Sequence, residues 1–223
     1  MKAIVLAAGR GERMRPITDQ LPKPLVPVAG RPLISYHLES LARSGIRDIV
    51  INLSYLGSMI RDALGDGARY GVRIAYSDEG PVALETGGGI FKALALLGSD
   101  PFLVVNGDIW TDYDFGRITL APAAHAHLVL VPNPPYLRGD FTLDGDRIVE
   151  STQPPYTYSG IGVYTPEFFA GCQAGKFPLL PLLKRAIAAR RLSGELYRGD
   201  WSDIGAPDRL AALEQRLAAG RVA

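Results

Sequence analysis

Short apolar runs alternate with amphipathic segments along the first half of the chain. Apolar runs with the length of buried strands occupy residues 3–7, 48–52, 72–76 and 102–106. Segments in which apolar positions recur at helical spacing occupy residues 33–44, 55–64 and 86–97. An alternation of strands and helices predicts an α/β fold with a largely parallel sheet.

The second half of the chain follows a different pattern. Four further strand-like runs occupy residues 127–132, 140–143, 147–150 and 158–164. The turn sequence Asp144-Gly145-Asp146 separates two of them, which is typical of a hairpin. We expect a small antiparallel extension of the same sheet rather than a separate domain. Helices are predicted at residues 113–118, 166–172, 179–190 and 207–219.

Composition limits the class of protein. With 223 residues, of which 47% are hydrophobic, the chain is long enough for one domain with a substantial core. A net charge of +1 gives no reason to expect a general nucleic-acid or membrane surface. Cys172 is the single cysteine, which excludes an internal disulfide and favours a reducing compartment. There is no signal-peptide pattern and no apolar run of ~20 residues, so we expect a cytoplasmic protein.

The stretch after the first predicted strand has the composition of a phosphate-binding loop. Gly9 and Gly11 allow close approach to backbone N–H groups, which commonly bind phosphate. Arg13, Arg15 and Lys23 add cations within a few residues. A plain tight turn explains the two glycines equally well. The patterns GxxxxGK[ST] and GxGxxG are both absent.

The whole string is more specific than its glycines. LAAGRGERMRPIT followed by PKPLVPVAGRPLI resembles the signature of nucleotidyltransferases that make nucleotide-sugars from sugar 1-phosphates. The departures are Glu12, Met14 and Ile17, where Thr, Leu and Leu are common. The resemblance implies a single Rossmann-like domain, with a mostly parallel mixed sheet flanked by helices. It also implies a divalent cation, for which we expect Mg²⁺, and attack of a sugar phosphate on the α-phosphorus of an NTP.

The same resemblance assigns roles within this loop. Arg13 and Lys23 fall on the family's phosphate-binding arginine and lysine. Arg13 is expected to steady the departing pyrophosphate, and Lys23 to offset charge at the α-phosphate. The predicted nucleotide contacts are Ala7, Ala8, Gly9, Gly11, Glu12, Arg13 and Lys23.

Two acidic residues are predicted to hold the metal. Asp108 follows a buried strand directly, at the sheet edge where α/β folds bind ligands, and a carboxylate there suits Mg²⁺. It matches the family's metal aspartate and joins Arg13 and Lys23 as a predicted catalytic residue. Asp203 lies in WSDIG, which resembles the family's W-x-D-[IV]-G-T with Ala206 in place of threonine. As bare sequence, either acid could belong to an ordinary turn.

The string ETGGGI, around Glu85 and Gly88, falls where the family contacts the nucleobase and ribose. Thr86 alone would be read as a helix N-cap. Together with VNGDIWTDYDF and GDF, the string resembles the uridylyltransferases that act on N-acetylmuramate 1-phosphate in peptidoglycan recycling. The implied reaction joins UTP and that sugar phosphate to give UDP-N-acetylmuramate and pyrophosphate.

Apart from Asn106, the sugar contacts are predicted in the second half of the chain, so residues 1–110 form a nucleotide-binding half and residues 111–223 a sugar-binding half. Arg138 is a candidate cation for the lactyl carboxylate of N-acetylmuramate, and a solvated loop arginine is an equal alternative. Each predicted contact could instead be a solvated or turn residue. The predicted sugar contacts are Asn106, Asp140, Glu150, Tyr158, Ser159 and Gly160.

Two other functions remain open on the sequence alone. One is guanylyl, thymidylyl or cytidylyl transfer to another sugar 1-phosphate, such as mannose or heptose 1-phosphate. The other is a catalytically silent sensor of nucleotide-sugars. In each case the expected partners are small molecules rather than nucleic acid or membrane, and a monomer is expected.

Overall fold

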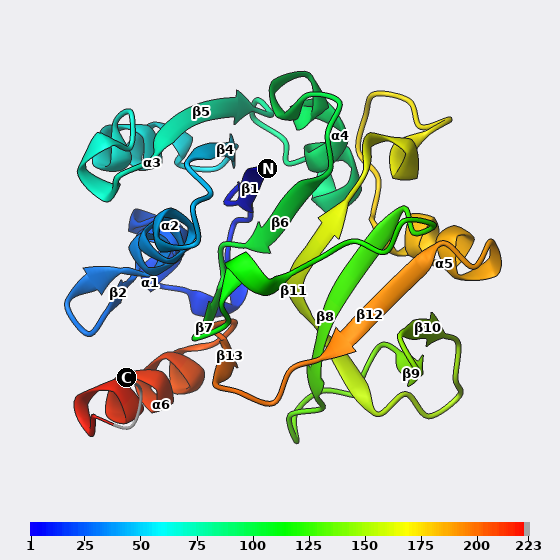
Figure 1. Cartoon of the computed structure of the whole chain (residues 1–223). Coiled ribbons are helices and arrows are strands. Elements are labelled where there is room, and N and C mark those ends of the chain that lie inside the picture. The colour runs from blue at the N-terminus through cyan, green and yellow to red at the C-terminus, as the bar shows by residue number, and fades with distance from the viewer. Residues whose placement is uncertain (221–223) are drawn as a thin grey trace.

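The computed structural model describes residues 1–220, and a large mixed sheet runs through them (Figure 1). Within these residues the sheet has nine strands in the order β5-β4-β1-β6-β11-β8-β12-β10-β9. Its strands are β1 (Lys2–Leu6), β4 (Asp48–Leu53), β5 (Arg73–Asp78), β6 (Phe102–Asn106), β8 (Ala126–Pro132), β9 (Thr142–Asp144), β10 (Arg147–Val149), β11 (Tyr156–Tyr164) and β12 (Leu192–Leu196).

Two short antiparallel ribbons and several helices complete the described chain. The ribbons pair β2 (Pro27–Val28) with β3 (Arg31–Pro32), and β7 (Ile109–Thr111) with β13 (Trp201–Asp203). The α-helices are α1 (Ile17–Gln20), α2 (Leu33–Arg43), α3 (Gly57–Leu64), α4 (Glu85–Leu97), α5 (Leu180–Ala188) and α6 (Pro207–Ala218). None of the helices formed by residues 1–220 is long and apolar enough to span a membrane.

The half of the sheet made by β5, β4, β1 and β6 is parallel. The chain runs outward from β1 to β4 and β5, then crosses back to place β6 on the other side of β1. The strand order therefore reverses between β1 and β6. The loops that leave these two strands diverge at one sheet edge, which is the position where open α/β folds bind ligands.

Side chains of the central strand alternate between two cores. Ala3 and Val5 pack in a cluster with residues of α2 and α3, whereas Ile4 packs on the other face with residues of α4. This period of two is what a strand buried on both faces requires. Helices therefore cover both faces of the parallel half, and the loops at its edge rest on a rigid support.

The second half continues the same sheet, and the predicted antiparallel extension is confirmed. β11 pairs antiparallel with both β6 and β8. Its register shifts between Tyr158 and Ile161, which marks a bulge close to the end of β6. The strand β12 was not predicted; it adds to β8 in parallel.

Two predicted helices are wrong in type. Residues 113–118 form only the 3-10 turn Phe115–Arg117, and residues 166–172 only the 3-10 turn Pro166–Phe169. Packing and a side-chain cap decide the first of these segments. Tyr113 is fully buried with its hydroxyl donating to Glu195 at 2.6 Å, and the Asp114 carboxylate accepts from the Gly116 N–H at 2.9 Å. A regular helix would have to break both contacts.

Candidate functional site

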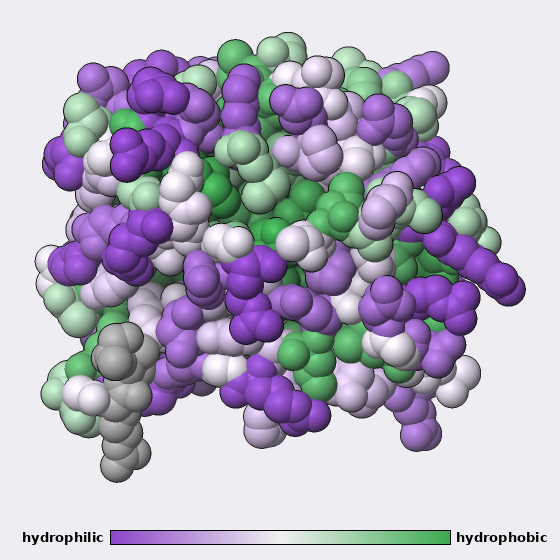
Figure 2. All heavy atoms as spheres, viewed as in Figure 1, coloured by the Kyte–Doolittle hydropathy of each residue, from purple (hydrophilic) through white to green (hydrophobic). Residues whose placement is uncertain are grey.

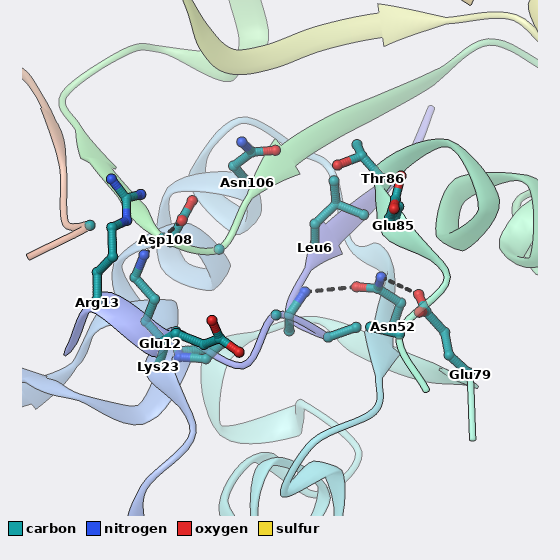
Figure 3. A pocket seen from close by; sticks show the side chains of 18 residues that line it. Leu6, Glu12, Arg13, Lys23, Asn52, Glu79, Glu85, Thr86, Asn106 and Asp108 are labelled. Atoms are coloured by element: carbon teal, nitrogen blue, oxygen red, sulfur yellow. Dashed lines mark hydrogen bonds and ion pairs between the residues drawn. The ribbon is translucent and has the colours of Figure 1, made fainter. Parts of the chain in front are cut away.

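A cavity of about 560 Å³ opens at the reversal point of the sheet (Figure 3). It lies beyond the carboxyl ends of β1, β4, β5 and β6. Figure 2 shows hydrophobic residues in a recess at the middle of the molecule's face, with hydrophilic residues around it. The cavity is lined by Leu6, Ala7, Ala8, Gly9, Gly11, Glu12, Arg13, Lys23, Pro24, Asn52, Glu79, Ala83, Glu85, Thr86, Asn106, Gly107, Asp108 and Gly205.

The loop after β1 forms one side of this cavity, which is the larger of two that adjoin each other. All seven nucleotide contacts predicted in the loop are lining residues. Gly11 has φ +68°, a conformation that favours glycine. A Cβ at this position would lie 3.0 Å from Thr18 Cγ2 and 3.3 Å from Lys23 Cβ. The Thr18 hydroxyl also donates to the Gly11 carbonyl at 2.8 Å. The turn at Gly11 is therefore fixed both by backbone conformation and by its neighbours.

Lys23 and Asp108 form an ion pair at the wall of the larger cavity. Lys23 Nζ lies 2.7 Å from Asp108 Oδ2. The lysine side chain is only 9% exposed, whereas that of Asp108 is 41% exposed. The lysine is thus held by the protein, and the carboxylate keeps a free face toward the cavity. Arg13 lines the same wall (Figure 3).

Asp203 comes close to this wall without lining it. The Ile204 N–H donates to the Asp108 carbonyl at 2.8 Å, so the two acidic segments are joined through their backbones. The Asp203 carboxylate pairs with Arg209, and both side chains are mostly buried. A Cβ at Gly205 would lie 2.7 Å from Asp203 Oδ1 and 2.8 Å from Arg13 Nη2, so Gly205, which lines the cavity, lies against both groups.

The donor set around Asp108 and Asp203 is small. Among residues 1–220, no group of three or more His, Cys, Asp or Glu side chains gathers to hold a metal. Mg²⁺ usually takes one or two carboxylates, with substrate phosphates and water as its remaining ligands. Asp108 and Asp203 suit such an ion, and the role of each as a ligand stays a prediction.

The start of α4 forms the opposite side of the larger cavity. Glu85 lines it with φ +60°, an uncommon conformation for a residue with a side chain, and lies 3.6 Å from Lys176 Nζ. Thr86 also lines the cavity, but it stands inside the helix and is not its cap. The structure therefore brings Glu85 to the cavity as the sequence predicted.

Gly88 does not line the larger cavity, in contrast to its predicted nucleobase contact. Its N–H donates to the Phe177 carbonyl at 3.0 Å. A Cβ on Gly87 would lie 2.6 Å from the Phe177 ring. The chain's own segment around Phe177 occupies the space beside these glycines. The two glycines do allow another group to approach α4 closely, but that group is the chain's own segment and not a ligand.

A second cavity of about 440 Å³ adjoins the first and shares Glu85, Thr86 and Asn106 with it. Asp140 Oδ2 accepts from the Tyr158 N–H at 2.9 Å, which fixes the carboxylate at the cavity wall. Burial raises the pKa of the Tyr158 hydroxyl, which lies 3.0 Å from that of Tyr164. The remaining lining residues of this smaller cavity are Phe141, Pro178, Leu179, Leu180 and Leu183.

Ser159 and Gly160 form the bulge of β11 and do not line either cavity. The Ser159 hydroxyl is buried and donates to the Val129 carbonyl at 2.7 Å. Gly160 has φ +84°, and a Cβ there would lie 2.7 Å from Asn106. Their predicted place in the sugar pocket is therefore indirect, because the bulge makes room for Asn106 between the two cavities.

Glu150 and Arg138 are exposed and line neither cavity. Glu150 directly follows β10, near the far edge of the sheet. This position gives no structural basis for its predicted sugar contact. No lysine or arginine of the described chain is among the residues that line the smaller cavity.

Sequence reasoning missed Asn52 and Glu79 in the larger cavity and the leucines of the smaller one. Asn52 and Glu79 do carry a positional signal, because Asn52 ends one predicted parallel strand and Glu79 closely follows the carboxyl end of the next. The leucines at the start of α5 carry none, since leucines at helical spacing are expected to be core.

Comparison with known proteins identifies the family of this chain. A family model described as nucleotidyl transferase matches residues 2–134. The N-acetylmuramate alpha-1-phosphate uridylyltransferase of Neisseria meningitidis serogroup B is 51% identical over 220 residues, covering 94% of this chain and 95% of that protein. The protein of the same name from Caulobacter vibrioides is 38% identical over 233 residues, covering 97% and 96%.

Solved structures show the same fold at lower identity. A Bacillus anthracis structure described as a glucose-1-phosphate thymidylyltransferase has a TM-score of 0.85 at 23% identity, covering 96% of this chain and 94% of that one. HddC from Yersinia pseudotuberculosis, complexed with GMP-PN, has a TM-score of 0.80 at 23% identity, covering 97% and 99%.

Proposed function

Because the chain belongs to the nucleotidyl transferase family, we propose that it transfers UMP from UTP to N-acetyl-α-muramate 1-phosphate. The products are UDP-N-acetylmuramate and pyrophosphate. The observation that carries this proposal is the identity to a uridylyltransferase of that name over nearly the full length of both chains. The two adjoining cavities support it, because the reaction needs a place for a nucleotide beside a place for a sugar.

The proposed reaction does not require a covalent bond between the protein and a substrate. A phosphate oxygen of the sugar phosphate forms a bond to the α-phosphorus of UTP, and the bond from that phosphorus to the pyrophosphate oxygen breaks. The nucleophile is already anionic, so no general base is needed. The protein must place two anions in line and reduce their repulsion.

Charged residues of the larger cavity are suited to this task. Lys23 is held rigidly beside Asp108 and would offset charge at the α-phosphate. Arg13 would bind the pyrophosphate as it leaves, since its guanidinium presents several donors to phosphate oxygens. Backbone N–H groups around Gly11 would add neutral donors. Asn106, shared by both cavities, would contact the sugar phosphate at their junction.

A divalent cation is the expected cofactor, and the charge of the larger cavity supports one. Its lining holds two cations, Arg13 and Lys23, against four carboxylates: Glu12, Glu79, Glu85 and Asp108. A triphosphate entering this cavity therefore needs further positive charge. We propose that Asp108, with Asp203, holds Mg²⁺, which would supply that charge along the phosphate chain.

We further infer that the enzyme acts in the cytoplasm, in the recycling of peptidoglycan sugars. The support is chemical: UTP is a cytoplasmic nucleotide, and a free N-acetylmuramate 1-phosphate has to come from a reaction that phosphorylates or releases the sugar. The product, UDP-N-acetylmuramate, suits a reaction that builds new cell-wall precursor.

A matrix of four NTPs against several sugar 1-phosphates, followed by pyrophosphate release with Mg²⁺, tests the proposed function. We expect the highest kcat/KM for UTP with N-acetylmuramate 1-phosphate. Preference for GTP with mannose or heptose 1-phosphate would replace the substrates and keep the chemistry. An absence of turnover with every pair, combined with binding of a nucleotide-sugar, would indicate a sensor instead.

A further inference from the structure

We propose that Asn52 and Glu79 form a positioning unit that sets the spacing between the phosphate loop and the start of α4. The two side chains cross the floor of the larger cavity and join its opposite sides (Figure 3). The inference rests on the proposed function in one respect only, which is that this cavity binds the nucleotide.

A continuous chain of hydrogen bonds carries the proposal. The Ala7 N–H donates to Asn52 Oδ1 at 2.7 Å, and Asn52 Nδ2 donates to Glu79 Oε1 at 2.6 Å. The Leu84 N–H then donates to Glu79 Oε2 at 2.6 Å. Asn52 is 4% exposed and Glu79 is 7% exposed. The chain therefore ties the first residue of the phosphate loop to the residue just before α4.

Hydrogen-bond polarity makes this pair of residue types specific. Both ends of the chain are backbone N–H groups, which can only donate. The two side chains between them must accept at their outer ends and still bond to each other. An asparagine beside a carboxylate satisfies all three contacts, and it also fixes which way the Asn52 amide points. Two carboxylates would repel at the central contact, and two amides would leave a donor facing a donor at one contact.

The third glycine of the GGG motif is explained by this unit. A Cβ at Gly89 would lie 3.0 Å from Asn52 Nδ2 and would overlap the Glu79 carboxylate. Gly89 is buried on the first turns of α4. Its lack of a side chain lets the helix approach the two side chains, so the motif serves the protein network rather than a ligand here.

A positioning role also explains why a charged residue, Glu79, is buried here. In the described part of the chain, no lysine or arginine forms an ion pair with Glu79. Burial of a carboxylate without a cation is costly, and neutral residues could fill the same space more cheaply. What a neutral apolar pair could not do is accept both backbone N–H groups and hold two loops at a fixed separation. Those loops carry Gly11 and Arg13 on one side and Glu85 on the other.

A reciprocal exchange tests the unit. Asn52→Asp alone sets two carboxylates against each other, and Glu79→Gln alone leaves one amide N–H facing a donor. The double variant Asn52→Asp/Glu79→Gln restores every contact: a carboxylate accepts from Ala7, an amide N–H bonds between the two side chains, and an amide oxygen accepts from Leu84. Ser35→Ala is the matched control, because it removes the 2.7 Å hydrogen bond that the buried Ser35 donates to the Pro32 carbonyl, away from both cavities.

The readout separates positioning from mere stability. The NTP is the one that the wild type uses best in the matrix, so an error in the UTP assignment does not affect the test. We expect each single variant to raise KM for the NTP about tenfold, as an unsatisfied buried contact of 1–3 kcal/mol implies, with KM for the sugar phosphate changed less than about twofold. The double variant should return KM for the NTP to within about threefold of wild type, and the control should lower Tm alone.

Three results would overturn the inference. One is a double variant no better than the worse single variant. Another is a pair of single variants that lower Tm while KM for the NTP stays unchanged. The third is an equal rise of KM for both substrates, which would indicate general damage to the fold rather than a defect in nucleotide positioning.

Discussion

The two cavities meet at Asn106, yet they are built on different principles. The larger cavity takes polar groups from the carboxyl ends of parallel strands, and several of them are held by a partner, as Lys23 is by Asp108. The smaller cavity is walled by leucines from the start of α5, and its fixed polar groups are few, chiefly Asp140. Charged groups are therefore concentrated in the larger cavity, whereas the smaller cavity is defined mainly by the shape of its apolar wall.

This contrast suggests how the protein divides its work. Phosphates need charged and N–H groups at fixed places, and the parallel sheet edge supplies them from rigid elements. A sugar ring offers hydroxyls and apolar faces, so its selection depends more on wall shape. Substitutions in the larger cavity should therefore act on rate and nucleotide binding. Those in the smaller cavity should act on the choice of sugar.

The strongest test of the contrast is Gly11→Val. The φ of +68° and the neighbouring Thr18 and Lys23 leave no room for a branched side chain, so the phosphate loop must shift. We expect nucleotide binding to be lost, as measured by calorimetry with UTP and Mg²⁺. Gly30→Val is the matched control: it has φ +78° but no atom within 4 Å of a Cβ, so it carries the strain without the displacement. Equal affinity in Gly11→Val and wild type would make the loop a structural turn.

Asp108→Asn should give the next largest effect. Loss of a carboxylate that we assign to the metal leaves phosphate charge uncompensated, and turnover should fall by at least ~10² while the fold persists. Asp203→Asn should behave alike if it is the second ligand. Asp114→Asn, which alters an exposed 3-10 cap, is the control. Near-normal turnover with Mg²⁺ in either variant would remove that residue from the site.

The choice of sugar should respond to one cation near the smaller cavity. The sequence singled out Arg138, whereas the structure places Lys176 within 3.6 Å of Glu85, which both cavities share. We expect Lys176→Ala to narrow the preference for N-acetylmuramate over N-acetylglucosamine 1-phosphate about tenfold, as loss of a charge-assisted contact implies. The measurement is kcat/KM for both sugars. A narrowing in Arg138→Ala, with none in Lys176→Ala, would return the role to Arg138.

The smallest effect at neutral pH concerns two histidines, His37 on α2 and His127 on β8. Burial lowers the pKa of His37 from 6.5 to about 4, and it also lowers that of His127. Between pH 6.5 and 4, His37 is protonated in the unfolded chain but stays neutral in the folded one. The free energy of unfolding that is present above pH 6.5 is therefore lost as the pH falls. His37 alone accounts for about 3 kcal/mol of this loss.

Urea unfolding of His37→Gln and His127→Gln at several pH values checks this. His37→Gln keeps an N–H donor for the Ile109 carbonyl, which His37 Nε2 contacts at 2.8 Å. We expect it to flatten the fall of unfolding free energy between pH 7 and pH 4.5 more than His127→Gln does. An unchanged pH profile in His37→Gln would show that the ring is protonated without cost in the native state.

The parallel strands were predictable within one or two residues, because a strand buried on both faces is a continuous apolar run. The later strands were less so. β12 contains Ser193 and Gly194 and has no strand signal of its own. It forms because it packs beside β8, and a Cβ at Gly194 would lie 2.8 Å from Ile148. β7 and β13 are too short to show a periodicity, and their pairing spans about ninety residues.

The candidate site was likewise predictable only in part. Motifs located the phosphate loop, Asp108 and Glu85 at the larger cavity. They could not reveal that Phe177 fills the space beside Gly87, because that contact joins segments about ninety residues apart. Nor could they place Ser159 in a buried bulge, since a serine hydroxyl that bonds the Val129 carbonyl looks the same in sequence as one that faces a ligand.

The late pairing of β13 with β7 has a consequence for synthesis on the ribosome. Nearly all residues that line the larger cavity lie before residue 110, but Gly205 and the neighbouring Asp203 arrive almost a hundred residues later. A nascent or prematurely ended chain would therefore carry a phosphate loop without its last wall. The larger cavity would be completed only when translation is nearly finished, and we expect fragments released early not to consume UTP.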